Sequence, residues 1–150
     1  MELLLWRHAE AEDGMPDAER KLTAKGEKQA AKMAAWLKQH LPGEARVLVS
    51  PTVRTRQTAA ALTPAGKVSK EIGPGASVAA VLGAAGWPGG HETVVVVGHQ
   101  PTLGEVAAYL LSDTQEMWSV KKGAVWWFSN RSRQGETETV LKAVMSPEFL

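Results

Sequence analysis

Residues 2–10 read ELLLWRHAE, and this stretch decides how the rest of the chain can fold. Leu3, Leu4 and Leu5 form a continuous apolar run, which is typical of a strand that is buried on both faces of a parallel sheet. Arg7 and His8 follow soon after the run. Because open α/β sheets bind ligands at the carboxyl ends of their strands, we expect these two side chains to lie at the functional edge of the sheet.

A second strand followed by a helix is predicted around Ser50. The run RVLV at 46–49 indicates a short strand, and Ser50-Pro51 after it predicts an N-cap with proline at the first helical position. Arg54 then falls in the first turn or so of the helix, where exposed amides and the helix dipole favour an anion. We interpret Arg56, two residues further on, as a solvated helical charge.

The clearest strand covers 93–97 and contains four consecutive valines. It leads directly into Gly98, His99 and Gln100, and Pro101 then starts a helix in the same way as Pro51. A glycine before His99 and a helix N-terminus after it distinguish this histidine from an ordinary surface histidine. His99 is therefore a third candidate functional residue at a strand end.

The other elements alternate in type, which predicts an α/β fold with a mostly parallel sheet. Thr23 is the expected N-cap of a helix that stops before Pro42. We further expect a weak strand at 67–72, a helix at 77–85, and two strands at 122–130 and 137–144 joined by a polar turn.

Composition limits the class of protein. A chain of 150 residues fits a single domain, 1–150, and its 17 cationic residues nearly balance its 16 acidic ones, which argues against a nucleic-acid partner. The absence of cysteine excludes disulfides, thiolate zinc sites and a cysteine nucleophile. The apolar run that starts at Leu3 is cut by Arg7 and is too short for a signal peptide or a membrane span. We therefore expect a soluble, cytoplasmic protein with no membrane partner.

Arg7, His8, Arg54 and His99 should meet in one crevice. Arginine binds phosphoryl oxygens bidentately and can position them for in-line attack, and a neutral imidazole can act as the nucleophile. Two arginines and two histidines at successive strand ends therefore predict a site for phosphoryl transfer.

The chain resembles the histidine phosphatase superfamily, and within it the small SixA-type phosphohistidine phosphatases. The matching segments are LWRHAEA at 5–11, RKLTAKG at 20–26, VLVSPTVRTRQTA at 47–59 and VVGHQPTLG at 96–104. The resemblance implies the three-layer α/β/α sandwich of the phosphoglycerate mutase-like fold. The family's usual glycine after the catalytic histidine is Ala9 in this chain.

The resemblance also implies roles for individual residues. His8 would be the nucleophile that becomes phosphorylated, Arg7, Arg54 and His99 would form the phosphate pocket, and Arg20 would be a peripheral substrate contact. Larger relatives take a general acid from the segment that spans 71–92 here, which leaves Glu71 as one candidate, and Glu10 beside the nucleophile turn is another.

Charge determines the expected mechanism. Neighbouring arginines disfavour a protonated His8, so its pKa should fall, and the neutral ring should attack to give a phosphohistidine intermediate that water hydrolyses. We expect no metal and no cofactor, because the arginines supply the positive charge and no carboxylate cluster suitable for a metal is evident.

The predicted function is removal of the phosphoryl group from a phosphohistidine on another protein, such as a phosphotransfer protein. The short segment 55–98 between Arg54 and His99 leaves little chain for a cap over the pocket, which favours a protein substrate over an enclosed metabolite. The alternatives are a general small-molecule phosphomonoesterase, a mutase, for which the chain is too short to build an enclosure, and a non-catalytic phosphate-binding regulatory module.

Overall fold

A computed structural model describes all residues, 1–150, and centres on a six-stranded sheet in the order β3-β2-β4-β1-β5-β6. The first four strands in this order run parallel to one another, and β5 and β6 are antiparallel additions at one side. The strands are β1 (Glu2–Arg7), β2 (Arg46–Val49), β3 (Lys67–Val68), β4 (Thr93–Gly98), β5 (Val125–Arg133) and β6 (Glu136–Met145).

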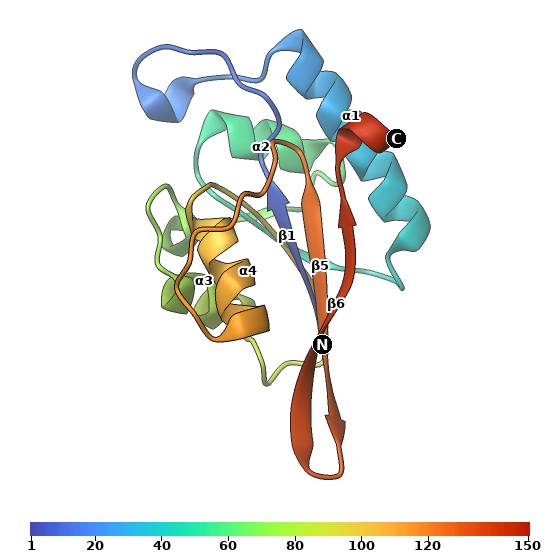
Figure 1. Cartoon of the computed structure of the whole chain (residues 1–150). Helices are drawn as coiled ribbons and strands as arrows, with labels where there is room; N and C mark the ends of the chain where they lie inside the picture. The colour runs from blue at the N-terminus through green and yellow to red at the C-terminus, as the bar shows by residue number, and fades with distance from the viewer.

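Helices cover both faces of the sheet (Figure 1). On one face, α1 (Ala24–His40) and α2 (Val53–Ala60) pack against one core cluster, and α3 (Val78–Ala85) and α4 (Thr102–Ser112) pack against a second cluster on the other face. Short 3₁₀ segments, η1 (Asp17–Glu19), η2 (Lys70–Ile72) and η3 (Pro147–Phe149), complete the chain. The predicted three-layer α/β/α sandwich with a mostly parallel sheet is confirmed.

Strand β1 lies inside the sheet and supplies both cores. Leu3 and Leu5 point into the cluster under α3 and α4, whereas Leu4 and Trp6 point into the cluster under α1 and α2. This alternation explains why the sequence shows a continuous apolar run rather than an alternating one, since both faces are covered. The parallel register pairs Arg7 with Gly98. It therefore places His8 and His99 side by side at the carboxyl edge.

Two sequence expectations need correction. The second helix begins at Val53, with Thr52 rather than Ser50 as its N-cap, and the Thr52 side chain accepts from the Thr55 amide. Ser50 is not available as a cap because its hydroxyl contacts His99. The predicted strand at 67–72 is reduced to β3, two residues long, and the remainder forms η2.

The hairpin of β5 and β6 is longer than the sequence predicts. Its strands extend to Arg133 and restart at Glu136, and the hairpin projects beyond the end of the sheet where the chain starts (Figure 1). The functional edge is at the opposite end of β1. No helix is both long and apolar enough to span a membrane.

Candidate active site

The turn after β1 is held by backbone hydrogen bonds from both neighbouring strands. The Arg7 amide donates to Ala124 O and the His8 amide donates to Gly98 O, each at 3.1 Å. The Gly123 amide donates back to the carbonyls of Arg7 and His8. Gly123 has a φ of +74°, a conformation that favours glycine. The position of His8 is thus determined by segments at least 90 residues away in sequence.

Ala9 fits this turn without backbone strain. It is not among the residues with positive φ, and its amide donates to Thr58 Oγ1 at 3.1 Å. Its side chain is fully buried and packs with Leu22 and Ala30 in a small apolar cluster. Alanine can therefore replace the family's usual glycine here, because its methyl group packs into this small buried cluster.

The hydrogen bond of His8 determines which ring nitrogen is free. His8 Nδ1 lies 2.7 Å from the carbonyl oxygen of Ala9, and because a carbonyl can only accept, Nδ1 carries the proton. In the neutral ring, Nε2 then keeps its lone pair. Burial, and next the positive charges of Arg54, Arg7 and Arg20, lower the pKa of His8 to about 4, although the hydrogen bond to Ala9 acts in the opposite direction. His8 is consequently uncharged at neutral pH, with a lone pair on Nε2 that is free to attack an electrophile.

Arg54 is the most enclosed cation of the site, with a side chain that is only 5% exposed. Its Nη1 donates to Asp17 O at 2.8 Å and its Nη2 contacts the Asp17 carboxylate at 3.1 Å. Burial raises the pKa of that carboxyl, but hydrogen bonds and charge from Arg54 and Arg20 outweigh it and the pKa is lowered. Asp17 therefore orients Arg54 from the loop that covers the strand ends.

Both arginines keep donors that no protein group uses. Arg7 Nη1 donates to Val120 O at 2.9 Å, and the Nε groups of Arg7 and Arg54 are buried without a hydrogen-bond partner. Burial lowers the pKa of Arg7, and a nearby anion would relieve this cost. Each guanidinium has five N–H donors, so the pair can bind a multivalent oxyanion without losing its existing contacts.

His99 lies opposite His8, with ring centroids 5.4 Å apart. Its Nε2 is 2.7 Å from Ser50 Oγ and its Nδ1 is 3.4 Å from Arg54 Nη2. Burial and the charge of Arg54 lower the pKa of His99 to about 3. Because a guanidinium can only donate, His99 Nδ1 accepts from Arg54, and Nε2 carries the proton and donates to Ser50 Oγ.

These side chains line one cavity of about 230 Å³. The structure brings together Arg7, His8, Arg54 and His99, as the sequence predicts, and Arg20 lies at the wall, where its Nε contacts Asp17 at 3.1 Å. The other lining residues are Ala11, Asp13, Pro74, Gln100 and Lys122.

The structure does not bring the two candidate general acids into this cavity. The Glu10 carboxylate accepts from Thr23 Oγ1 at 2.8 Å and lines a neighbouring groove, and Glu71 is exposed in η2 and is not a lining residue. Asp13 is the carboxylate that does line the cavity. Sequence reasoning missed Asp13 because it lies in a loop with no periodic pattern, and its proximity to His8 in sequence was the only available signal.

The cavity has the composition of an oxyanion site rather than a metal site. No group of three or more histidine, aspartate or glutamate side chains is arranged to hold a metal ion.

Arg56 is exposed and does not line the cavity, which agrees with the prediction that it is a solvated charge on the helix.

Comparison with known proteins identifies the family. Residues 3–75 match the model of the histidine phosphatase superfamily (branch 1). An uncharacterized protein of Picosynechococcus sp. is 36% identical over 166 residues, which cover 100% of this chain and 99% of that protein. The chain belongs to the histidine phosphatase superfamily.

Several relatives of this histidine phosphatase superfamily member are SixA proteins. A phosphohistidine phosphatase SixA homolog of Haemophilus influenzae is 34% identical over 127 residues, which cover 73% of this chain and 77% of the homolog. The structure of a putative phosphohistidine phosphatase SixA from Nakamurella matches with a TM-score of 0.82 and 29% identity over 97% of this chain and 95% of that one. The protein histidine phosphatase SixA complexed with tungstate matches with a TM-score of 0.81 and 28% identity over 99% of both chains.

Proposed function

We propose that this chain is a phosphohistidine phosphatase, which removes the phosphoryl group from a histidine side chain of a protein through a phosphohistidine intermediate on His8. The observation that carries the proposal is the neutral His8 ring, with Nδ1 bound to Ala9 O, in a cavity that it shares with Arg7, Arg54 and His99. This arrangement combines an uncharged nucleophile with two fixed cations, which is what attack on a phosphoryl group requires.

In the first step, the lone pair of His8 Nε2 forms a bond to phosphorus, and the bond between phosphorus and the substrate nitrogen breaks. The electron pair of that bond stays with the leaving imidazole, which takes up a proton. In the second step, water attacks the phosphorus, His8 leaves, and inorganic phosphate is released with the remaining proton going to solvent or the product. Each step is an in-line displacement.

Arg7 and Arg54 would neutralise charge on the phosphoryl oxygens during both displacements. Asp17 already holds Arg54 in place, so little reorganisation accompanies the reaction. His99 would help to hold Arg54 in place, because its Nδ1 accepts from Arg54 Nη2 while its Nε2 donates to Ser50 Oγ. A related SixA protein forms a complex with tungstate, a tetrahedral oxyanion like phosphate, which agrees with an oxyanion as the group that is bound.

Two observations support a phosphohistidine as the substrate. The segment between Arg54 and His99 contains the rest of α2, then β3, η2, α3, β4 and their connections, and of residues 71–92 only Pro74 lines the cavity, so no cap encloses a small substrate. A histidine leaving group accepts a proton readily near its ordinary pKa of about 6.5, and an alcohol leaving group does not. The SixA names of one relative and two solved structures agree with this substrate class.

A second candidate function is general phosphomonoester hydrolysis. The observation that favours it is Asp13, because a carboxylate at the cavity wall could protonate an alcohol leaving group. Asp13 is exposed, which makes it a weaker choice than a buried acid whose protonated form is stabilised.

The test compares kcat/KM for a phosphohistidine protein with kcat/KM for p-nitrophenyl phosphate and phosphoserine. We expect the phosphohistidine protein to be preferred by at least tenfold, and we expect rapid quenching to trap radioactive phosphate on His8. A clear preference for phosphoserine would replace the proposal with the second candidate. No labelled enzyme and no phosphate release with any of the substrates would indicate a phosphate-binding module without turnover.

A further inference from the structure

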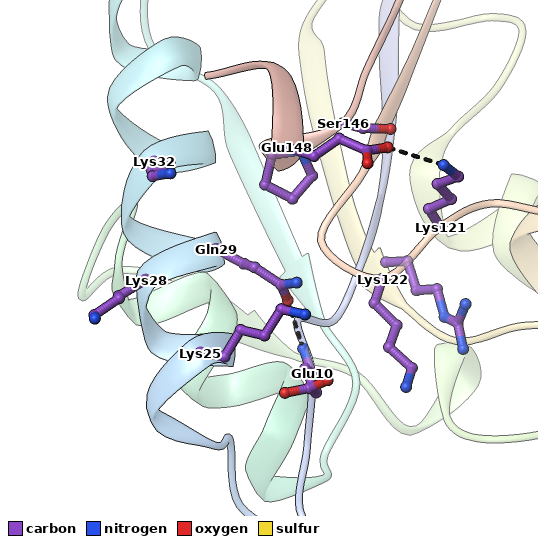
Figure 2. Close-up of a pocket in the computed structure, with 11 residues that line it drawn as sticks. Glu10, Lys25, Lys28, Gln29, Lys32, Lys121, Lys122, Ser146 and Glu148 are labelled. Atoms are coloured by element: carbon purple, nitrogen blue, oxygen red, sulfur yellow. Dashed lines mark hydrogen bonds and ion pairs between the residues drawn. The ribbon is translucent and has the colours of Figure 1, made fainter.

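A second concave surface lies next to the candidate active site, and the proposed mechanism does not use it. This groove has a volume of about 510 Å³ and is lined by Arg7, Glu10, Lys25, Lys28, Gln29, Lys32, Lys121, Lys122, Ser146, Pro147 and Glu148 (Figure 2). Six of these side chains are cationic and two are acidic, and no hydrophobic side chain lines it. The whole chain has a net charge of only +1, so the groove concentrates a positive excess that the rest of the surface offsets.

Both acidic side chains in this lysine groove already have partners. Glu148 forms an ion pair with Lys121 at 2.8 Å, and the Glu10 carboxylate accepts from Thr23 Oγ1 at 2.8 Å. By contrast, Lys25, Lys28, Lys32 and Lys122 form no ion pair. Figure 2 shows the α1 lysines on one wall and Lys121 and Lys122 on the opposite wall. The groove thus has two walls with positive charges that are free to bind an external anion.

The lysine groove and the catalytic cavity share residues. Arg7 and Lys122 line both, so the two concavities meet at the end of β1. A molecule that lies along the groove therefore reaches the edge of the cavity that contains His8. Binding in the groove can deliver a phosphorylated side chain to the nucleophile.

We propose that the lysine groove binds an acidic segment of the protein that carries the phosphohistidine, an inference that rests on the proposed function. Lys25, Lys28 and Lys32 follow helical spacing and extend over about 10 Å of α1, at roughly 1.5 Å per residue. That length matches two turns of a partner helix, and carboxylates on one face of such a helix would complement the groove.

The lining of the groove favours an acidic protein over other polyanions. Single-stranded nucleic acids are bound by basic grooves that also offer aromatic side chains for base stacking, and no aromatic side chain lines this groove. Peripheral binding to anionic lipid commonly combines cations with apolar side chains that insert, and those are also missing from the lining. Carboxylates on a folded protein surface require only cations at the correct spacing.

The test uses two synthetic helical peptides that each carry one phosphohistidine. One peptide has four glutamates on a single face within two turns, and the other has glutamines at the same positions. We expect the wild-type protein to show a kcat/KM on the order of tenfold higher for the acidic peptide at low salt, with a preference that shrinks as salt is raised.

The charge-reversal variant Lys25→Glu/Lys28→Glu should lose this preference, measured as the ratio of kcat/KM for the two peptides. Both changes lie near the N-terminus of α1, where glutamate is compatible with the helix dipole. The ratio does not depend on the amount of folded protein. The matched control is Lys67→Glu/Arg133→Glu, which changes net charge equally at exposed sites in β3 and β5, outside the groove, and should keep the preference.

Each result has a distinct meaning. Equal turnover of the two peptides by the wild-type protein, or a preference that the groove variant retains, would overturn the docking inference and leave the proposed function standing. Turnover of p-nitrophenyl phosphate without turnover of either peptide would refute the proposed function, and the docking inference with it. The docking inference would also be wrong if the groove variant lost binding to a single-stranded DNA oligonucleotide or to phosphatidylserine vesicles but kept its peptide preference.

Discussion

The catalytic cavity and the lysine groove meet at Arg7 and Lys122 but are built in different ways. In the cavity, His8, Arg54 and His99 are at most 7% exposed, and each makes at least one hydrogen bond to another protein group. In the groove, the lysines of α1 are exposed and carry no ion pair. One region has buried donors that protein contacts hold in place, and the other has solvent-exposed charges without ion-pair partners.

Under the proposed function, the cavity would carry out the chemistry and the groove would recognise the substrate. Fixed, desolvated donors act through direct hydrogen bonds, which are strong because the donors need no reorganisation during the reaction. Exposed lysines act through a longer-range electrostatic field, which salt screens over about 10 Å. Changes to the buried residues His8, Arg54 and His99 should therefore alter the chemical steps with every substrate. Changes in the groove should alter only the choice of substrate.

The largest effect is expected from His8→Ala, which removes the nucleophile. We expect loss of turnover and of phosphoenzyme with all substrates, because no other side chain in the cavity offers an equivalent free nitrogen on the proposed path. The measurement is phosphate release together with radioactive labelling of the protein. Substantial labelling of this variant would assign the nucleophile to another residue, with His99 as the first to examine.

Arg54→Ala should reduce kcat/KM on the order of a hundredfold, the scale observed when one preorganised transition-state donor is removed. It also releases Asp17, whose carboxylate contacts Arg54 at 3.1 Å. Arg56→Ala is the matched control, since Arg56 lies on the same helix but is exposed, and it should stay within about twofold of the wild type. Steady-state kinetics on one phosphohistidine peptide and on p-nitrophenyl phosphate would show whether both substrates are affected equally.

Asp13→Asn distinguishes between leaving groups. Turnover of phosphoserine should fall about tenfold, less than the ~10²–10⁴-fold typical of general acids because Asp13 is exposed, and turnover of phosphohistidine should change little. The comparison of kcat/KM for the two substrates measures this directly. An equal loss with both would show that Asp13 contributes to binding rather than to protonation of the leaving group.

The pH dependence of the free enzyme should be weak above pH 5. With the pKa of His8 lowered to about 4, kcat/KM should fall by less than about twofold between pH 7 and pH 5, whereas an ordinary histidine with a pKa near 6.5 would reduce kcat/KM more than tenfold.

The free energy of unfolding should, by contrast, depend strongly on pH in this range. Below pH 6.5 the histidines of the unfolded chain bind protons, whereas the buried rings of His8 and His99 stay neutral until the pH is much lower. The free energy of unfolding is therefore highest above pH 6.5 and declines as the pH falls toward 4.

Denaturant titrations at several pH values would test this linkage. The slope should reach up to about 1.4 kcal/mol per pH unit for each of His8 and His99. A stability that is flat between pH 6.5 and pH 5 would show that the two rings are more hydrated than their surroundings indicate.

The smallest effect is expected from single changes that do not touch the chemistry. Ala9→Gly removes a fully buried methyl group and adds backbone freedom, so it should lower the free energy of unfolding by about 1 kcal/mol. Lys32→Ala in the lysine groove should change it by less than about 0.5 kcal/mol, because the side chain is exposed. Urea denaturation would measure the change in the free energy of unfolding for each variant. Equal changes would contradict the expected difference between a buried side chain beside the cavity and an exposed side chain in the groove.

The sequence was informative wherever one local pattern determined one element. The apolar run after Glu2 and the four valines before Gly98 specify buried parallel strands, and the residues after them meet in the cavity. The start of α2 was less predictable, because Ser50 and Thr52 are both acceptable caps. The contact between Ser50 Oγ and His99 decides between them, and it joins residues 49 positions apart.

Features that depend on distant segments could not be predicted. The lysine groove combines lysines of α1 with Lys121 and Lys122, which are separated by almost ninety residues, and no spacing rule connects them. Asp13 lies in an irregular loop, and the position of such a loop follows from its contacts rather than from periodicity. The four central residues of the site, Arg7, His8, Arg54 and His99, were predictable because the carboxyl ends of parallel strands lie at the same edge of the sheet.

The way in which β1 is enclosed affects when the turn that carries His8 can form during synthesis. Arg7 Nη1 bonds to Val120 O and Trp6 Nε1 bonds to Gly123 O, and β5, which completes the pairing of β1, does not begin until Val125. A ribosome must therefore translate more than four fifths of the chain before the histidine turn can acquire its native hydrogen bonds. Nascent chains that still lack β5 contain every residue of the cavity, yet they lack one of the two strands that flank β1.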